Sequence, residues 1–420
     1  MTTFDRFERS IPSLMDELAP ARVPDYVDDL LRTTARMPQR PWWSALERWI
    51  PMGVIARTSQ APRVPWRYLA IAAALLILAS AALIYVGSHV RALPPPYGPA
   101  RNGVIVYGAA NGDVVAFDPA TNTSRTLIEG SADERYPLFT NDGSHLVFAR
   151  TPDADHEVDF IANADGSAVR DLLPLGSTIK WFEWSATGEQ ALVTREVDGV
   201  MTTFLADAAT GQVTSIDLDP ALGITLATYR PGHDEILYEH VPADGQAGTK
   251  VYVGRSDGSV PLRPLALSPD AVFEAWPSPD GRKLVYSTWG TDESSQGRIH
   301  VLDLDNGDDQ PLMFEGSAGH VEVNPQFSPD GRSIVLTRLD ADGFRVTIVP
   351  ADGNGPVTPV GPPYPAGSGT PDLTWSPDGT SVLAGYPDGT VRLLPVDGRP
   401  GRTMTGMAWD RGITWQRLAP

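Results

Sequence analysis

The sequence of 420 residues contains no cysteine. Disulfide frameworks, thiolate zinc sites and cysteine nucleophiles are therefore excluded. Basic residues are also scarce, since 33 Lys and Arg stand against 52 Asp and Glu for a net charge of -19. A chain with this excess of negative charge repels a phosphate backbone, so nucleic acid is not an expected partner.

Residue patterns that carry catalysis or bind metals are weak as well. The seven histidines are scattered, and none has a second histidine three or four residues away, as paired metal ligands on a helix would. Residues 254–258 match the G-x-S-x-G pattern of serine hydrolases but lie in an expected strand-to-strand turn, whereas that nucleophile needs a strand-to-helix turn. We therefore predict no metal, no cofactor and no enzymatic activity.

One long uncharged run stands out near the N-terminus, from Leu69 to Val86. Extended to residues 68–88, it would form a helix of about 31 Å, which matches a bilayer core of about 30 Å. Trp66, Tyr68 and Tyr85 lie at its ends, where membrane-interface aromatics are typical. The sequence predicts a transmembrane helix over residues 68–88, with a buried core helix as the alternative.

The charges on either side of this run predict its orientation. Residues 1–67 hold 10 Arg against 8 acidic residues, whereas residues 88–420 hold 23 bases against 44 acids. Positive charge favours the cytoplasmic side, so the N-terminus is expected inside the cell and the rest of the chain outside. The prolines at positions 94–96 predict a stiff spacer over residues 89–100.

Residues 1–67 are expected to form a small α-helical cytoplasmic region, because their apolar residues recur at helical spacing. Trp42, Trp43 and Trp49 form an apolar stripe at the end of this region. Two interpretations remain open: a self-packed bundle whose tryptophans lie in the membrane interface, or a module that binds a partner protein.

After residue 100 the sequence repeats. An aromatic residue followed by Ser-Pro-Asp-Gly occurs at Phe327–Gly331 and at Trp375–Gly379, and weaker copies align at positions 139, 184, 229, 277 and 415. The intervals of 40 to 50 residues are typical of propeller blades. Each period also contains alternating strand patterns separated by Asp-Gly or Asn-Gly turns, which indicates four strands per unit.

The two ends of the repeat region complement each other. Trp415 belongs to a first strand with no second strand after it, while Val104–Tyr107 form a second strand with no first strand before it. One blade is therefore expected to combine residues 413–416 with residues 103–128. This closure predicts an all-β fold, a seven-bladed β-propeller over residues 101–420, with six or eight blades as alternatives.

These turns resemble the WD-like repeats of TolB-type bacterial β-propellers, over about residues 100–420. The resemblance is specific at residues 327–331 and 375–379, fair at 278–281, and degenerate at 186–187 and 232–233. It implies a binding platform; some propellers of this family carry a hydrolase domain, for which this chain is expected to leave no room. The arrangement of a helical region, one span and an exported domain also resembles membrane-bound anti-sigma factors, although their zinc motif is absent.

The expected propeller geometry predicts one binding face. Connections between the second and third strands, and from one blade to the next, emerge at the same end of the ring, and the longest and most aromatic ones are there. A ring of carboxylates at the channel mouth would favour a basic or cationic ligand, whereas simple solvated loops are the alternative. The candidate ligand- or partner-binding residues are Trp289, Asp292, Glu293 and Tyr364 on loops, and Glu274, Glu322 and Asp372 at the starts of first strands.

The functional prediction is a propeller anchored in the lipid bilayer of the cell membrane, which binds or senses an envelope ligand or protein outside the cytoplasm. In its finer form, residues 1–67 act on a cytoplasmic protein such as a sigma factor. The alternatives are a passive scaffold of the cell envelope and a propeller enzyme.

Overall fold

The computed structural model describes residues 72–76, 97–153, 156–172, 179–197, 200–242, 247–255, 257, 261–289, 297–317, 320–365 and 369–419. The chain divides into two compact units, Met1–Val90 and Arg91–Pro420. In the first unit only residues 72–76 are described, and they are helical. No helix among the described residues is long and apolar enough to cross a membrane. The predicted cytoplasmic region, the remainder of the predicted span and the residues Trp42, Trp43, Trp49, Trp66, Tyr68 and Tyr85 lie outside the described residues.

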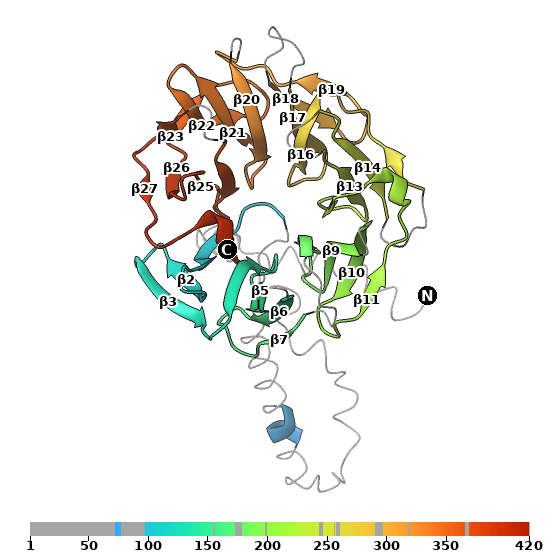
Figure 1. Ribbon diagram of the computed structural model, residues 1–420, viewed down its shortest axis with the longest axis vertical. Helices are drawn as coiled ribbons and strands as arrows, with labels where there is room; N and C mark the ends of the chain where they lie inside the picture. The colour runs from blue at the N-terminus through green and yellow to red at the C-terminus, as the bar shows by residue number, and fades with distance from the viewer. Residues whose placement is uncertain are drawn as a thin grey trace, which may run out of the picture. The chain divides into compact units, whose positions relative to one another are not determined.

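The second unit is a seven-bladed β-propeller, in which seven four-stranded antiparallel sheets surround a central channel (Figure 1). The prediction of seven blades is confirmed, and the alternatives of six and eight are wrong. From the innermost strand outward, the blades are blade 1 (β28 Ile413–Leu418, β1 Arg101–Gly108, β2 Val114–Asp118, β3 Thr123–Ile128), blade 2 (β4 Asp133–Phe139, β5 His145–Asp153, β6 His156–Asn163, β7 Arg170–Asp171), blade 3 (β8 Ile179–Trp184, β9 Gln190–Val197, β10 Val200–Asp207, β11 Val213–Ser215), blade 4 (β12 Leu226–Tyr229, β13 Ile236–His240, β14 Lys250–Gly254, β15 Arg263–Pro264), blade 5 (β16 Ala271–Pro277, β17 Lys283–Thr288, β18 Arg298–Asp303, β19 Asp309–Pro311), blade 6 (β20 Val321–Phe327, β21 Ser333–Asp340, β22 Gly343–Pro350, β23 Thr358–Tyr364) and blade 7 (β24 Asp372–Trp375, β25 Ser381–Gly385, β26 Val391–Pro395, β27 Arg402–Thr403). Two short 3-10 helices, Pro220–Leu222 and Trp409–Arg411, precede blade 4 and β28.

Blade 1 is built from both ends of the propeller sequence, as predicted. β28 pairs antiparallel with β1, with Trp415 opposite Ile105 and Ile413 opposite Tyr107. The last strand of the chain therefore supplies the innermost strand of the first blade, and the ring closes through backbone hydrogen bonds without a covalent link.

The Ser-Pro-Asp-Gly turns repeat because each residue has a defined role in connecting the first strand to the second. In blade 5 the Ser278 hydroxyl donates to Asp280 Oδ1 (2.6 Å) and accepts the backbone N–H of Lys283 (3.0 Å). Asp280 also accepts the N–H of Arg282 (3.1 Å), and Gly281 has a φ of +66°, which favours glycine. Blades 6 and 7 repeat this network at residues 328–333 and 376–381.

The hydrophobic core lies between blades. Successive side chains of a strand point to opposite faces of its sheet, and both faces of a blade are covered by neighbouring blades. In blade 5, Leu284 and Tyr286 pack against blade 4, whereas the intervening Val285 packs against blade 6; all three are fully buried. This arrangement explains the runs of consecutive apolar residues in the second strands.

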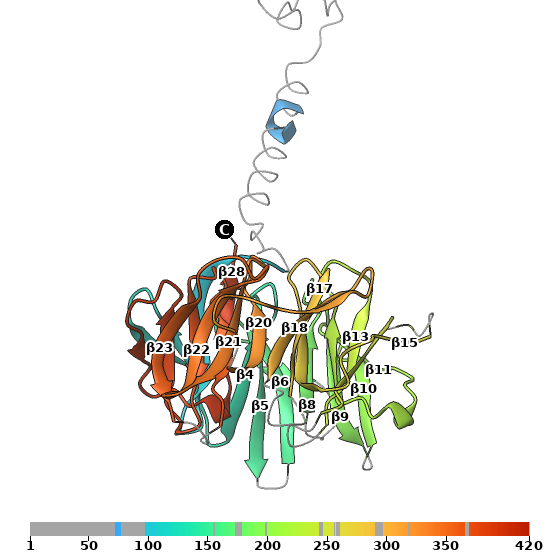
Figure 2. The ribbon, with the colours of Figure 1, turned by 90° about the horizontal axis from the view of Figure 1, so that it is seen from above.

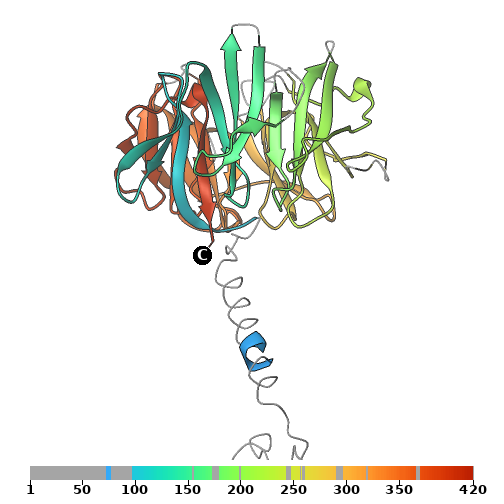
Figure 3. The same ribbon diagram turned by 90° about the horizontal axis from the view of Figure 1, so that it is seen from below.

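The ring has two distinct faces. The entry face carries the turns between first and second strands, and here the chain enters the propeller: the Ala100 N–H donates to the Pro377 carbonyl (2.9 Å) and Arg417 Nη2 donates to the Gly98 carbonyl (2.7 Å). The C-terminal strand β28 ends at the same face (Figures 2 and 3). The loop face, at the other end of the channel, carries the connections between second and third strands and between blades.

Candidate functional site

Three predicted site residues, Glu274, Glu322 and Asp372, lie on the innermost strands β16, β20 and β24 of three successive blades. The backbone bulges at this point, with register shifts between Val272 and Trp276 and between Val323 and Gln326. Such bulges redirect side chains at the rims of closed sheets. The bulges of blades 5 and 6 and the start of β24 in blade 7 all lie in the loop-face half of the innermost strands.

Asn324 connects these blades at the mouth. It has a φ of +54°, which is unusual for a residue other than glycine. Its backbone N–H donates to Ser287 Oγ of blade 5 (3.2 Å), and its side-chain amide donates to Thr370 Oγ1, just before blade 7 (2.9 Å). The strained residue thus holds the segment that leads into Asp372.

Glu274 and Asp372 are both exposed, and the charge of Glu274 acts on Asp372. Partial desolvation raises the pKa of Asp372, and the negative charge of Glu274 raises it further. Two carboxylates that repel each other favour a cation between them, because the cation removes the repulsion. Both exposed carboxylates lie near the loop-face ends of innermost strands, where their charges favour a basic group.

Glu322 has a different environment. It is fully buried, and Arg338 Nη2 donates to its Oε1 at 2.8 Å. Desolvation raises the pKa of Glu322 to about 7, although the charge of Arg338 opposes the shift. Glu134 and Arg150 form the same pair in blade 2 at 3.0 Å, with the same spacing of 16 residues. Of the three predicted carboxylates, Glu274 and Asp372 are therefore exposed at the mouth and Glu322 is not. The spacing of 16 residues between glutamate and arginine, which recurs in blades 2 and 6, is a sequence signal for this ion pair.

The aromatic loop residues differ from each other in exposure. The Trp289 side chain is 45% exposed at the loop face, and its backbone N–H donates to the Asp270 carbonyl (2.8 Å). Tyr364 is half-buried, with its ring centroid 5.0 Å from that of Tyr386 between blades 6 and 7. Asp292 and Glu293 lie outside the described residues.

A second concave site, which the sequence analysis missed, lies at the entry-face end of the channel. It is a cavity of about 350 Å³. The innermost strands of blades 4, 5, 6, 7 and 1 contribute one aromatic residue each, and these are the aromatic residues that mark the sequence repeat or lie next to its marker. The aromatic residues from these strands are Tyr229, Trp276, Phe327, Trp375 and Trp415, and Tyr97 joins them from the segment that precedes β1.

Glu183 of β8 contributes a carboxyl group to this cavity. It accepts the backbone N–H of Tyr229 at 3.2 Å, but desolvation raises its pKa to about 8. Glu239 of β13 is fully buried, accepts the N–H of Ala275 at 3.0 Å, and also has a pKa raised by burial to about 8. Both side chains are therefore mainly neutral acids at pH 7. Over the part of the chain that the structure describes, no group of three or more His, Asp or Glu side chains is arranged to hold a metal ion.

Comparisons with known proteins give no match to a protein-family model, and no curated protein matches the sequence. Solved structures do match. TolB from Acinetobacter baumannii is 17% identical with a TM-score of 0.41, over 75% of this chain and 66% of that chain. A structure from a study of two prolyl endopeptidases is 15% identical (TM-score 0.56; 74% of this chain, 50% of that chain), and an oligogalacturonate lyase from Vibrio parahaemolyticus is 11% identical (TM-score 0.53; 70% and 91%). The chain thus spans about two thirds of TolB and half of the prolyl endopeptidase.

The prediction of no enzymatic activity is contradicted by these neighbours. It rested on the lack of a recognisable catalytic pattern in a propeller sequence. Prolyl endopeptidases and a lyase contain the same fold, as does the tricorn protease. A propeller sequence without such a pattern is therefore no ground for excluding an enzyme.

Proposed function

We propose that this chain is a tethered β-propeller that binds a ligand or protein partner through its loop face. The observation that carries the proposal is the point of entry: Gly98 and Ala100 are hydrogen-bonded to the opposite face. A tether attached there leaves the loop-face mouth, with Glu274 and Asp372, free to meet a partner. Partners with a basic group suit this mouth, because the two exposed carboxylates repel each other in its absence.

A membrane anchor over residues 68–88 would supply the tether, with the N-terminus in the cytoplasm and the propeller outside. Residues 1–67 would then report the state of the propeller to a cytoplasmic protein, in the manner of an anti-sigma factor. The uncharged run and the charge difference between its two sides support this part of the proposal. A passive envelope scaffold differs from it in one respect, because its residues 1–67 would capture no cytoplasmic protein.

Reporter fusions test the orientation. A periplasmic-type phosphatase fused after Pro420 is expected to be active, and a fluorescent protein that folds only in the cytoplasm is expected to remain dark at the same position. The same two reporters fused before Met1 should give the reverse pattern. Fluorescence at the C-terminus together with phosphatase activity at the N-terminus would overturn the proposed orientation.

Removing the two mouth carboxylates tests the binding face. The double variant Glu274→Gln/Asp372→Asn is expected to bind a tetralysine peptide at least about tenfold more weakly than the wild type, because each lost charge-assisted hydrogen bond contributes about 1.5–3 kcal/mol. Isothermal titration calorimetry at low salt measures the affinity.

The matched control is Glu189→Gln/Asp308→Asn, which changes the net charge equally but alters two exposed acids in other turns, between β8 and β9 and between β18 and β19. This control is expected to retain wild-type affinity. If both double variants weaken binding equally, the peptide responds to the overall charge of -19 and not to the mouth.

A further inference from the structure

Glu183 differs from two other glutamates of the innermost strands in its lack of a cationic partner. Glu134 and Glu322 each form an ion pair with an arginine of the neighbouring strand, at 3.0 and 2.8 Å. Glu183 accepts hydrogen bonds from the backbone N–H of Tyr229 (3.2 Å) and from Thr228. Within the part of the chain that the structure describes, no Lys, Arg or His side chain pairs with it. A cation is therefore the group that its surroundings leave to be supplied.

The entry-face cavity provides the space for such a group. Its volume of about 350 Å³ lies in the range of small-molecule sites, which is about 300–1,000 Å³. Glu183 is the only acidic residue among the described residues that line the cavity. An acid that lines a largely aromatic cavity can direct the orientation of a ligand, because it offers the one polar contact of its kind.

Two tryptophans extend across the channel beside Glu183. The ring centroids of Trp181 in blade 3 and Trp276 in blade 5 are 5.8 Å apart, although blade 4 lies between these blades. The contact therefore reaches across the inner side of blade 4, where Trp181 Nε1 donates to the Ala227 carbonyl (2.9 Å). Side chains alternate along β8, so Glu183 points to the same side of the strand as Trp181. Glu183 thus lies on the channel side together with the aromatic pair.

The aromatic rings of the cavity wall suit both a cation and an apolar group. Trp276 and Trp375 line the cavity and are half-buried, so part of each ring is accessible. Trp375 Nε1 donates to the Gln326 carbonyl (3.3 Å), which satisfies the indole N–H within the protein. The accessible part of the ring is therefore available for apolar contact, and the faces of such rings attract an ammonium ion.

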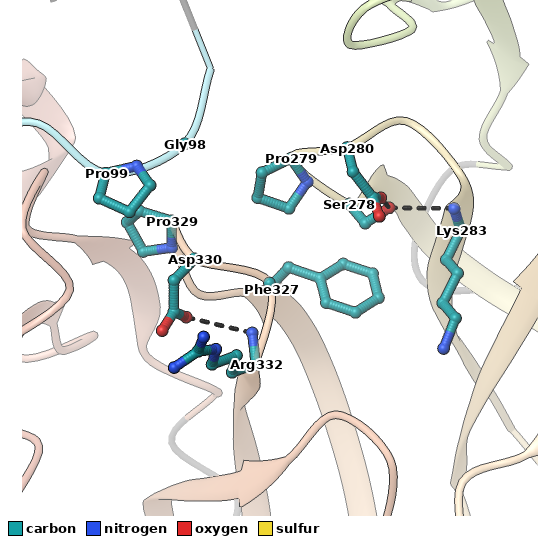
Figure 4. A pocket seen from close by; sticks show the side chains of 11 residues that line it. Gly98, Pro99, Ser278, Pro279, Asp280, Lys283, Phe327, Pro329, Asp330 and Arg332 are labelled. Atoms are coloured by element: carbon teal, nitrogen blue, oxygen red, sulfur yellow. Dashed lines mark hydrogen bonds between the residues drawn. The ribbon is translucent and has the colours of Figure 1, made fainter. Parts of the chain in front are cut away.

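A groove on the entry face continues this cavity toward the surface. The groove has a volume of about 530 Å³ and lies between the turns of blades 5 and 6, with Pro279 on one side and Pro329 on the other (Figure 4). Gly98, Pro279, Phe327 and Pro329 line both the groove and the cavity, so the two hollows are contiguous. A ligand can therefore reach Glu183 from the entry face.

We propose that the entry-face cavity binds a small primary amine with an apolar body. The ammonium group pairs with Glu183, in the way that arginines pair with Glu134 and Glu322, and the apolar body packs against Trp276 and Trp375. This site goes beyond the proposed function, because it lies at the opposite end of the channel from the loop-face mouth.

Binding of the amine is coupled to release of a proton. Burial raises the pKa of Glu183 to about 8, so the free protein holds this side chain mainly as a neutral acid at pH 7. An ammonium ion beside the carboxyl group lowers its pKa, and the proton leaves to solvent. The surrounding titratable groups keep their state: Tyr97, Tyr229 and Glu239 have pKa values raised by burial and by the charge of Glu183, and Arg417, which lines the cavity from blade 1, is a permanent cation. Close to one proton is therefore expected per amine bound.

Isothermal titration calorimetry of the full-length protein with 2-phenylethylamine at pH 7 tests the site. Titrations in phosphate and in Tris, which differ in ionisation enthalpy, give the number of protons released. 2-Phenylethanol has the same apolar body without the charge and is expected to bind at least about tenfold more weakly, because the charge-assisted hydrogen bond is lost. A wild-type protein that does not prefer the amine to the alcohol would overturn the proposal.

Glu183→Gln assigns the binding to this side chain. The amide has the shape of the neutral acid and keeps an oxygen for the Tyr229 N–H, so the fold is expected to be retained, as far-UV circular dichroism would show. The variant is expected to bind the amine at least about tenfold more weakly and to release no proton. The matched control Glu189→Gln, in the exposed turn between β8 and β9, is expected to keep both the affinity and the proton release.

Unchanged affinity or unchanged proton release in Glu183→Gln would overturn the inference. Loss of amine binding in Glu274→Gln/Asp372→Asn, together with its retention in Glu183→Gln, would place the amine at the loop face; the inference would then fail while the proposed function stands. Conversely, loss of tetralysine binding at the loop face leaves the amine measurements unaffected, so the two failures are distinguishable.

Discussion

Replacing Trp415 with alanine is expected to lower the free energy of unfolding by about 3–5 kcal/mol, the usual cost of truncating a buried tryptophan. Trp415 is 7% exposed and packs with Ile105, Tyr107 and Leu383 where blades 7 and 1 meet. It also lies on β28, whose pairing with β1 closes the ring. Truncation therefore weakens the one junction that has no covalent continuity. Urea denaturation followed by far-UV circular dichroism measures the change.

The control is Trp289→Ala, at a side chain that is 45% exposed at the loop face. A surface substitution of this kind is expected to change the free energy of unfolding by less than about 0.5 kcal/mol. Deleting residues 411–420, and with them β28, is expected to abolish cooperative unfolding, because blade 1 loses its innermost strand. Equal effects of the two tryptophan substitutions would show that β28 does not close the ring.

Stability is expected to fall as the pH rises from 5 to 8. Burial raises the pKa of Glu183 and of Glu239 from 4.5 to about 8 in the folded protein. Because the folded pKa lies above the unfolded value, the stabilising contribution is complete below pH 4.5 and is lost as the pH approaches 8. Over this interval each carboxyl group lowers the free energy of unfolding by about 1.4 kcal/mol per pH unit. Aspartates with lowered pKa values, such as Asp280 and Asp378, act below about pH 4 and do not affect this window.

Glu239→Gln isolates one of these groups. The amide has the shape of the neutral acid and retains an oxygen to accept the Ala275 N–H. The variant is expected to reduce the slope of stability against pH by about 1.4 kcal/mol per unit between pH 5 and 8. Glu189→Gln, at an exposed turn, should leave the slope unchanged. An unaltered slope in Glu239→Gln would show that this carboxyl group is ionised in the folded protein. Urea titrations at four pH values are sufficient for the comparison.

Local chemistry made the blades predictable. In the turn of residues 278–283, serine, aspartate and glycine satisfy hydrogen bonds and a positive φ among residues at most five apart. Such constraints act between residues that are close together in the sequence. The repeat, the blade count and the split blade could therefore be predicted from the sequence. The carboxylates Glu274 and Asp372 could be assigned to one mouth for a related reason, since strand direction alternates regularly around each blade.

The environment of each site residue depended on contacts between blades, and no local pattern contains those. Glu322 and Asp372 both lie at the starts of innermost strands, yet Arg338 forms an ion pair only with Glu322. The segment before Asp372 is held by the hydrogen bond from Asn324 to Thr370, two residues that are 46 positions apart. Tyr97 lines one cavity with Glu183 and Tyr229 only because the closed ring brings the inner strands of blades 3 and 4 to the point of chain entry. The sequence by itself determined the number, order and closure of the blades, because turns and alternation are local. Only the tertiary structure decided which carboxyl groups are charged, paired or neutral, because desolvation depends on every atom that surrounds them.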